Sequence, residues 1–566
     1  MNFEARKITV WMMMLLLFIG QVYGQRTITE EYKLKFDDVL NLMENKYVDE
    51  PEFAALIDEA IIGMVKELDP HSDYMTAEEY KKMSEPLTGN FEGVGIQFNI
   101  LKDTILVVSP ISGGPSEKLG IRSGDKIVTI EDTVVAGIGI TNRDVIDKLR
   151  GDKGTKVRVG IYRRRVKDLI DYTITRDKIP IFSVDASYML TPEIGYVKLN
   201  RFSQTTMREF YEALDELQPK GMKHLVLDLR GNSGGYLNTA IQLSDEFLPD
   251  DDLVVYTEGV SNPKREHFAT RKGRLEKGKI VVLINEGSAS ASEIVSGAIQ
   301  DHDRGLIIGR RSFGKGLVQR PFKLRDGSTL KLTTARYYTP SGRCIQRSYE
   351  DGNEEYRKER QRRSEHGEYF NEDSIHVDSE EKYYTDNKRV VYAGGGILPD
   401  IFVPLDTTEG SDLLGDLIRK GYFNQFINEY VDVNRSKLKA TYPDFETYDS
   451  NFNVDDAFMA EFLAYAEKED AANEKKDSDT LEVPVTENAD SLLIIAATEE
   501  EERIKREKDL RTSNNIIRLR LKALLARTLW KTEEFYRVFN SDDVVVSKAI
   551  ESIEDKTFRK MKLSYN

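Results

Sequence analysis

Residues 223–247, KHLVLDLRGNSGGYLNTAIQLSDEF, decide the fold class of this chain. An apolar strand core from Leu225 to Leu227 precedes a glycine-rich turn, and the segment from Leu237 to Phe247 follows that turn. A short apolar run bounded by glycines predicts a buried strand, whereas apolar residues at helical spacing predict a helix. The stretch is therefore a strand–turn–helix unit.

The same alternation continues on both sides, from about 176 to 345. We expect strands at 195–199 and 280–284 and helices at 205–217 and 289–299. Strands that alternate with helices predict a layered α/β domain. The strand-like sequence GGGILPDI at 394–401 is expected to complete this core, so the core takes residues 176–345 and 391–405.

The 566 residues exceed what one hydrophobic core usually holds, so the chain should have several domains. Apolar residues at helical spacing predict a helical N-terminal segment, and short strands with glycine turns predict a small β-rich domain after it. The expected regions are a helical segment at 25–85, a β-rich domain at 86–175, a charged insertion at 346–390 that forms an exposed loop or is disordered, and a helical C-terminal extension at 406–566 with an acidic linker at about 467–512.

The N-terminus has the pattern of an export signal. Arg6 and Lys7 precede an apolar run, Ile8 to Gly20, which is too short to span a bilayer comfortably. We expect a signal peptide at 1–24 with cleavage after Gly24, and hence a periplasmic or otherwise extracytoplasmic protein; an uncleaved membrane anchor facing the periplasm is the alternative.

Composition excludes several classes of function. A formal net charge of −16 argues against nucleic-acid binding, which needs a basic surface. One cysteine, Cys344, excludes an intramolecular disulfide framework and multi-cysteine metal sites, and no histidine pair has the spacing of a metal-binding helix. We therefore expect no metal.

Ser233 is the first of two candidate nucleophiles. It lies in GNSGG, residues 231–235, which closely matches the signature around the nucleophile of trypsin-like proteases. A trypsin-like site needs an upstream histidine and aspartate in a double β-barrel. Only His71 and His224 lie upstream, neither falls in an all-β catalytic domain, and the surrounding sequence is strand–turn–helix. Ser233 is therefore disfavoured.

Ser290 is the second candidate. It lies in NEGSASASE, residues 285–293, after an apolar strand and at the start of a helix. Free backbone N–H groups and the positive end of the helix dipole at such a position suit a developing oxyanion. The pair Ser290 and Glu293 also fits a helix-capping box, so this segment alone leaves both roles open.

Lys315 changes the balance between these roles. It lies between two glycines in FGKG, residues 313–316, with Phe313, Leu317 and Val318 beside it. A lysine acts as a general base only when neutral, and burial among apolar groups lowers its pKa toward the required range. A Ser–Lys pair is a known variant of the catalytic triad, although a plain turn or phosphate-binding lysine fits FGKG as well.

The chain resembles the carboxy-terminal processing peptidases, also called tail-specific proteases, over about residues 30–345 and again at 394–404. The segments that carry the resemblance are SASASE at 288–293, FGKG at 313–316, LDPHS at 68–72, DLRGN at 228–232, TPSG at 339–342 and the strand at 395–401. The resemblance implies a crotonase-like α/β peptidase core in which Ser290 is the nucleophile and Lys315 the base.

The resemblance also assigns supporting residues. Gln319 matches a position that orients the lysine in some members, and Asp301 matches a carboxylate implicated in others, although a polar role at a helix C-terminus suits Asp301 equally well. Backbone N–H groups of Ala291 and Gly231 are implied as oxyanion donors, which would explain GNSGG without a nucleophilic serine. No cofactor is implied.

Residues 86–175 resemble a PDZ domain in their order of elements and in the segment Gly93-Val94-Gly95-Ile96. In that family such a loop presents backbone N–H groups to the terminal carboxylate of a peptide, which then adds as an extra strand. The expected partners are therefore proteins or peptides with accessible C-termini.

The resulting hypothesis is a serine endopeptidase that recognises C-terminal tails and cleaves through an acyl-enzyme. Two rivals are a PDZ scaffold with an inactive core and a crotonase-like enzyme of acyl-CoA chemistry; the second explains neither the signal peptide nor the PDZ segment. For the extension, dimerisation into a homo-oligomer, substrate capture and partner contact all stay open.

Overall fold

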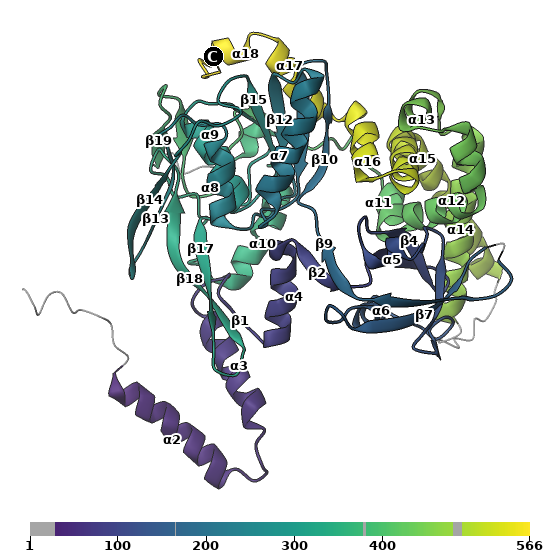
Figure 1. Ribbon diagram of the computed structural model, residues 1–566, viewed down its shortest axis with the longest axis horizontal. Coiled ribbons are helices and arrows are strands. Elements are labelled where there is room, and N and C mark those ends of the chain that lie inside the picture. Colours follow the sequence, from purple (N-terminus) through teal and green to yellow (C-terminus); the bar gives the residue numbers. More distant parts are fainter. Residues whose placement is uncertain (1–28, 165, 377–380, 479–488, 566) are drawn as a thin grey trace, which may run out of the picture. The chain divides into compact units, whose positions relative to one another are not determined.

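The computed structural model describes residues 29–164, 166–376, 381–478 and 489–565, in two units (Figure 1). The expected signal peptide lies outside the described residues. The first unit, 1–68, contains helices α2 (Glu30–Lys46) and α3 (Phe53–Lys66), as the apolar spacing predicts. No helix of the described residues is both long and apolar enough to cross a membrane.

The second unit, Asp69–Asn566, contains the small β-rich domain. Its sheet runs β3 (Ile96–Ile100), β4 (Ile105–Pro110), β5 (Lys126–Ile130), β7 (Lys156–Tyr162) and β8 (Ile170–Thr175), with β6 (Thr133–Val134) on β5 and helices α5 (Pro115–Lys118) and α6 (Asn142–Leu149). Buried side chains such as Val107, Ile127 and Val159 form a core of its own. Strand β3 is an edge strand, so one side of its backbone is open to a further strand.

A six-stranded sheet forms the centre of the α/β core. Its order is β10 (Val184–Met189), β11 (Ile194–Leu199), β12 (His224–Asp228), β15 (Ile280–Ile284), β16 (Leu306–Gly309) and β21 (Ile401–Phe402). Only β10 is antiparallel to its neighbour. The predicted α/β class is confirmed, and the sequence after residue 394 returns to this sheet as expected.

Helices cover both faces of this sheet (Figure 1). Leu225 and Leu227 point to one face, against α7 (Thr206–Leu217), α8 (Leu237–Asp245) and α9 (Ala291–Asp301), whereas Val226 points to the other. The second face is covered by α17 (Val544–Glu554) and α18 (Thr557–Lys560). Parallel sheets need both faces covered, so the end of the chain completes the core and is not merely an appended extension.

A second, antiparallel sheet carries the segment after Lys315. Its strands are β1 (Asp73–Met75), β13 (Leu253–Gly259), β14 (Asn262–Phe268), β17 (Leu317–Lys323) and β18 (Thr329–Tyr338). Helix α4 (Ala77–Thr88) follows β1, and the pair β2 (Asn90–Gly93) and β9 (Asp177–Pro180) encloses the small β-rich domain in sequence.

The helical part of the C-terminal region has its own core. Its helices are α11 (Asp412–Arg419), α12 (Tyr422–Thr441), α13 (Phe445–Asn451), α14 (Asp456–Ser478), α15 (Ala489–Leu529) and α16 (Thr532–Phe539). The expected acidic linker is wrong for 467–478 and 489–512, which are helical, because Glu, Lys, Arg and Ala are good helix formers. The rest of that linker, 479–488, lies outside the described residues.

The charged insertion is also structured where it is described. It forms α10 (Asn353–Glu365) and a hairpin of β19 (Lys382–Tyr384) and β20 (Val390–Tyr392). Tyr356 and Arg363 of α10 are buried, so the expectation of an exposed or disordered loop is wrong. The reason is that Glu359 and Glu368 of the insertion pair with the buried Arg311 of the core. The exact domain limits stay predictions.

Candidate active site

Ser290 precedes α9, directly after the loop that leaves β15. Its backbone has φ 54° and ψ −113°, a conformation that non-glycine residues rarely adopt and that surrounding contacts must hold. The Ser290 N–H donates to the Glu293 carboxylate at 2.7 Å, as the capping-box prediction requires. A cap of this kind does not exclude chemistry at the hydroxyl.

Glu293 connects Ser290 to the lysine turn. Its carboxylate is fully buried and also accepts from the Ser312 hydroxyl at 2.5 Å and from the N–H groups of Gly314 (2.7 Å) and Lys315 (2.9 Å). Burial raises the pKa of Glu293 above its usual value, although these hydrogen-bond donors partly oppose that effect. The sequence had suggested only the capping role for this residue.

Tyr337 of β18 makes a second connection. It is 1% exposed, and its hydroxyl donates to the carbonyls of Ser290 (3.1 Å) and Lys315 (2.5 Å). Burial raises the pKa of Tyr337 well above its usual value, so the hydroxyl stays a donor. Sequence reasoning missed Tyr337, because only the pairing of β17 with β18 brings it here.

Lys315 has the electrostatics of a lysine that can lose its proton. Burial, followed by the charge of the neighbouring Lys331 ammonium, lowers its pKa to about 8 against the opposing effects of Glu293 and Asp69. A pKa near neutrality is what a general base needs at physiological pH.

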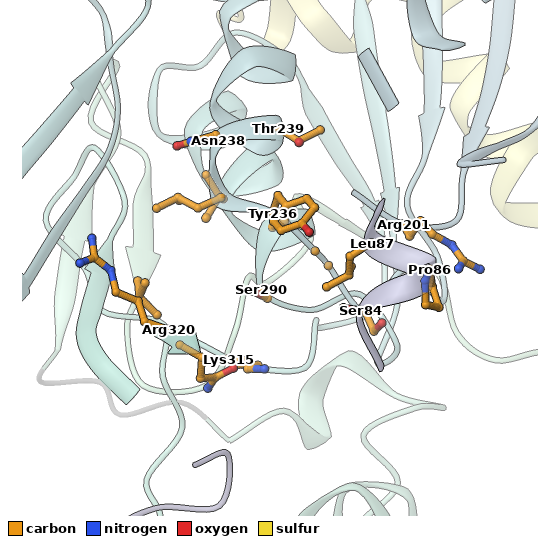
Figure 2. A pocket seen from close by; sticks show the side chains of 18 of the residues that line it. Ser84, Pro86, Leu87, Arg201, Tyr236, Asn238, Thr239, Ser290, Lys315 and Arg320 are labelled. Atoms are coloured by element: carbon orange, nitrogen blue, oxygen red, sulfur yellow. The ribbon is translucent and has the colours of Figure 1, made fainter. Parts of the chain in front are cut away.

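Ser290 and Lys315 line one cavity of about 1060 Å³ (Figure 2). Leu237, Ile294 and Leu317 are among its apolar lining residues. Its walls come from α4, from residues 200–204, from the glycine turn at 233–235, from the starts of α8 and α9, and from β17 and β18. Such a cavity holds several residues of an extended peptide.

Gln319 lines the same cavity as Lys315. A register shift between Val318 and Gln319 interrupts the pairing of β17 with β18 at this point. The buried Gln319 Nε2 has no hydrogen-bond partner within the described ranges. The orienting role of Gln319 stays a prediction, because its amide is at the site without a bond to the lysine.

The glycine turn lies directly against Ser290. A Cβ atom at Gly234 would lie 2.8 Å from the Ser290 Cβ and 3.0 Å from the Ala291 nitrogen. Ser233 also lines the cavity, but His224 lies at the far end of β12, where its Nδ1 accepts from the Lys279 N–H. His224 is therefore not in place to serve Ser233 as a base.

Two predicted supporting residues do not fit their roles. The Gly231 N–H already donates to the Asn285 side chain at 2.8 Å, and Gly231 is not among the cavity-lining residues, so its prediction as an oxyanion donor is wrong. Asp301 is the last residue of α9, at the opposite end from Ser290, and pairs with the fully buried Arg343 at 2.7 Å. Asp301 is therefore structural.

Two other N–H groups belong to residues that line the cavity, Ala291 and Gly235. The Ala291 N–H makes no hydrogen bond within the described part of the chain, and neither does the Gly235 N–H. Gly235 pairs with Phe202 in an isolated parallel β-bridge. The hydrogen bonds of this bridge are made by the residues on either side of Gly235, so the Gly235 N–H stays unpaired in the described structure.

The predicted carboxylate loop lies between β2 and β3. Gly93 ends β2, Ile96 begins β3, and Gly95 has φ +75°, which favours glycine. The N–H groups of Val94 and Gly95 have no acceptor among the described residues, whereas both carbonyls do. The loop therefore offers two free donors beside the open edge of β3.

Comparison with known proteins identifies the family. The model of peptidase family S41 matches residues 193–352, and that of the PDZ domain matches 93–174. A carboxy-terminal-processing protease of Bartonella bacilliformis is 42% identical over 317 residues, which cover 55% of this chain and 72% of that protein. This chain belongs to the carboxy-terminal-processing proteases. It is a serine-type peptidase with a PDZ domain.

Other known proteins and family models match further parts of this carboxy-terminal-processing protease. Carboxy-terminal processing protease CtpA of Bacillus subtilis is 37% identical over 337 residues, 58% of this chain and 71% of its own. The N-terminal domain of activating protease CtpB matches 21–79, and a family of unknown function matches 413–487. A solved photosystem II D1 C-terminal processing protease is similar over 67% of this chain and 89% of its own, at 28% identity and a TM-score of 0.35.

Gly234→Ala should lower kcat of this carboxy-terminal-processing protease by about 10²-fold or more. The added methyl group would contact Ser290 and Ala291, at a φ of +102° that alanine resists. Steady-state hydrolysis of a fluorogenic peptide measures the effect, with thermal unfolding as the check on folding. A folded variant with kcat within threefold of the parent would contradict the close approach of the Gly234 backbone to Ser290.

Proposed function

We propose that Ser290 and Lys315 form a catalytic dyad that cleaves peptide bonds through an acyl-enzyme. The observation that carries the proposal is Lys315 itself, whose pKa lies at about 8 and which lines the same cavity as Ser290. Glu293 and Tyr337 each hydrogen-bond the main chain of both residues. Placement of both groups by shared contacts favours a reacting pair over a turn lysine.

The proposed reaction starts from the neutral amine. Lys315 accepts the proton of the Ser290 hydroxyl while the serine oxygen attacks the carbonyl carbon of the substrate. The tetrahedral intermediate collapses as its carbon–nitrogen bond breaks, and the Lys315 ammonium gives its proton to the leaving amine. Water then attacks the ester carbonyl and gives a proton to the Lys315 amine. The ester carbon–oxygen bond breaks, and Lys315 returns that proton to the serine oxygen, which restores the enzyme.

The N–H groups of Ala291 and Gly235 are the proposed oxyanion donors. Both are unpaired in the described structure, and Ala291 and Gly235 both line the cavity next to Ser290. Donors that are fixed before the reaction stabilise the developing charge without reorganisation.

The PDZ domain is proposed to bind the C-terminal tail of a protein substrate. The open edge of β3 can accept the tail as an added strand, and the free N–H groups of Val94 and Gly95 can bind its carboxylate. The expected export signal at 1–24 would make the substrates extracytoplasmic proteins.

A pair of peptides that differ only at the C-terminus tests this function. We expect cleavage of an unstructured protein or peptide that ends in apolar residues with a free carboxylate, and a KM at least about tenfold higher for its C-terminal amide. Cleavage assayed by mass spectrometry gives both values. Equal KM for acid and amide would contradict tail recognition, and binding without cleavage would favour the scaffold hypothesis.

A further inference from the structure

Helix α10, from the charged insertion, contacts the segment that carries Lys315. It begins at Asn353, immediately after the residues that match the S41 family. Three of its side chains reach this segment or its direct neighbours: Tyr356, Glu359 and Arg363. We call these three residues the α10 brace.

Arg363 binds the main chain just before the lysine turn. It is 4% exposed, and its two terminal nitrogens donate to the carbonyls of Ser312 and Arg311, each at 3.0 Å. Its Nε donates to Glu368 at 2.7 Å, and the same carboxylate binds the Arg311 side chain at 2.7 Å and 2.8 Å. A planar guanidinium makes these bonds from three separate nitrogens in a fixed fork, whereas a lysine has a single nitrogen.

Tyr356 and Glu359 act on the turn through Arg347. The Arg347 guanidinium lies 3.8 Å from the Tyr356 ring centre and 4.2 Å from that of Phe313, and it pairs with Glu359. The Arg347 N–H donates to the Gly314 carbonyl at 3.2 Å. The brace therefore contacts both the side chain and the main chain of the residues that precede Lys315.

Tyr356 also fixes the residue His71. Its hydroxyl lies 2.8 Å from the His71 Nε2. Burial, followed by the charge of Lys315, lowers the pKa of His71 to about 3, so this imidazole stays neutral beside the lysine. A neutral, fixed neighbour adds no charge to the lysine pocket.

We propose that the α10 brace positions the lysine base: together with Glu293 it holds the Phe313–Gly316 turn, so that Lys315 stays shielded from water and directed at Ser290. The inference rests on the proposed function, because it assigns a role to the support of Lys315. The charged groups that face the lysine, Lys331, Glu293 and Asp69, are not part of the brace.

Arg363→Met tests the brace, with Arg357→Met on the exposed side of the same helix as the matched control. For Arg363→Met we expect kcat to fall about 10- to 100-fold with KM within threefold, because a small displacement of a catalytic group costs rate more than binding. The pH profile of kcat should also shift its inflection upward by at least about 0.5 units as water reaches the ammonium. Arg357→Met should change neither.

Glu359→Gln is the second variant, since Glu359 is partly exposed and its loss threatens folding less. This variant should also lower kcat and move the inflection of the pH profile upward, at an unchanged unfolding temperature. Folded Arg363→Met and Glu359→Gln variants with the parent's inflection would overturn the proposal, whether kcat falls or not. If Ser290→Ala kept its activity, the dyad itself would fail, which is a different result from a failed brace.

Discussion

Ser290→Ala should lower kcat by at least about 10⁴-fold, because removal of a nucleophile leaves only binding and oxyanion stabilisation. Among the described residues the Ser290 hydroxyl donates no hydrogen bond, and its backbone contacts with Glu293 and Tyr337 remain in an alanine variant. The fold and PDZ binding should therefore persist. Hydrolysis rates, circular dichroism and the anisotropy of a labelled C-terminal peptide measure the three properties.

Ser233→Ala is the matched control for that loss. Ser233 lines the same cavity, and its sequence context is the more familiar one, yet no described histidine lies in place to activate it. We expect kcat within about tenfold of the parent. A larger loss with Ser233→Ala than with Ser290→Ala would reverse the assignment of the nucleophile.

Lys315→Met should lower kcat by roughly 10³- to 10⁴-fold with little change in KM, since the proton of Ser290 loses its acceptor. In the parent, activity should rise with pH through about 8, because only the neutral amine acts as base and the pKa of Lys315 lies there. The variant should lose this inflection. Initial rates between pH 6 and 10 provide the test.

Lys331→Met serves as the control for that pH profile. The Lys331 ammonium helps to lower the pKa of Lys315, so its removal should move the inflection to higher pH while the lysine base is retained. An inflection that moves to lower pH, or one that survives in Lys315→Met, would show that another group titrates.

Local pattern predicted most of the architecture. The strand–turn–helix unit at 223–247 forms β12 and α8, and the return at residue 401 forms β21, because apolar periodicity reports burial directly. The pattern failed for α10 and α15, where charged residues form helices with ion pairs along the helix and contacts to distant segments. Such pairing does not show in hydrophobic periodicity.

The candidate site was predictable only in part. Ser290 and Lys315 share a cavity as expected, because motif spacing and glycines constrain them locally. Tyr337 and the α10 brace were missed, since they reach the site through strand pairing and buried charge contacts. Gly231 was predicted as a donor and Gly235 was missed, because sequence does not show which N–H groups are already bonded.

Covalent labelling maps the nucleophile most directly. A serine-reactive fluorophosphonate probe should modify the parent protein once, and peptide mapping by mass spectrometry should place the adduct on Ser290. Labelling should accelerate as pH rises through about 8 and should be nearly absent in Lys315→Met. An adduct on Ser233, or full proteolytic activity in protein whose Ser290 is quantitatively labelled, would contradict the Ser290–Lys315 dyad.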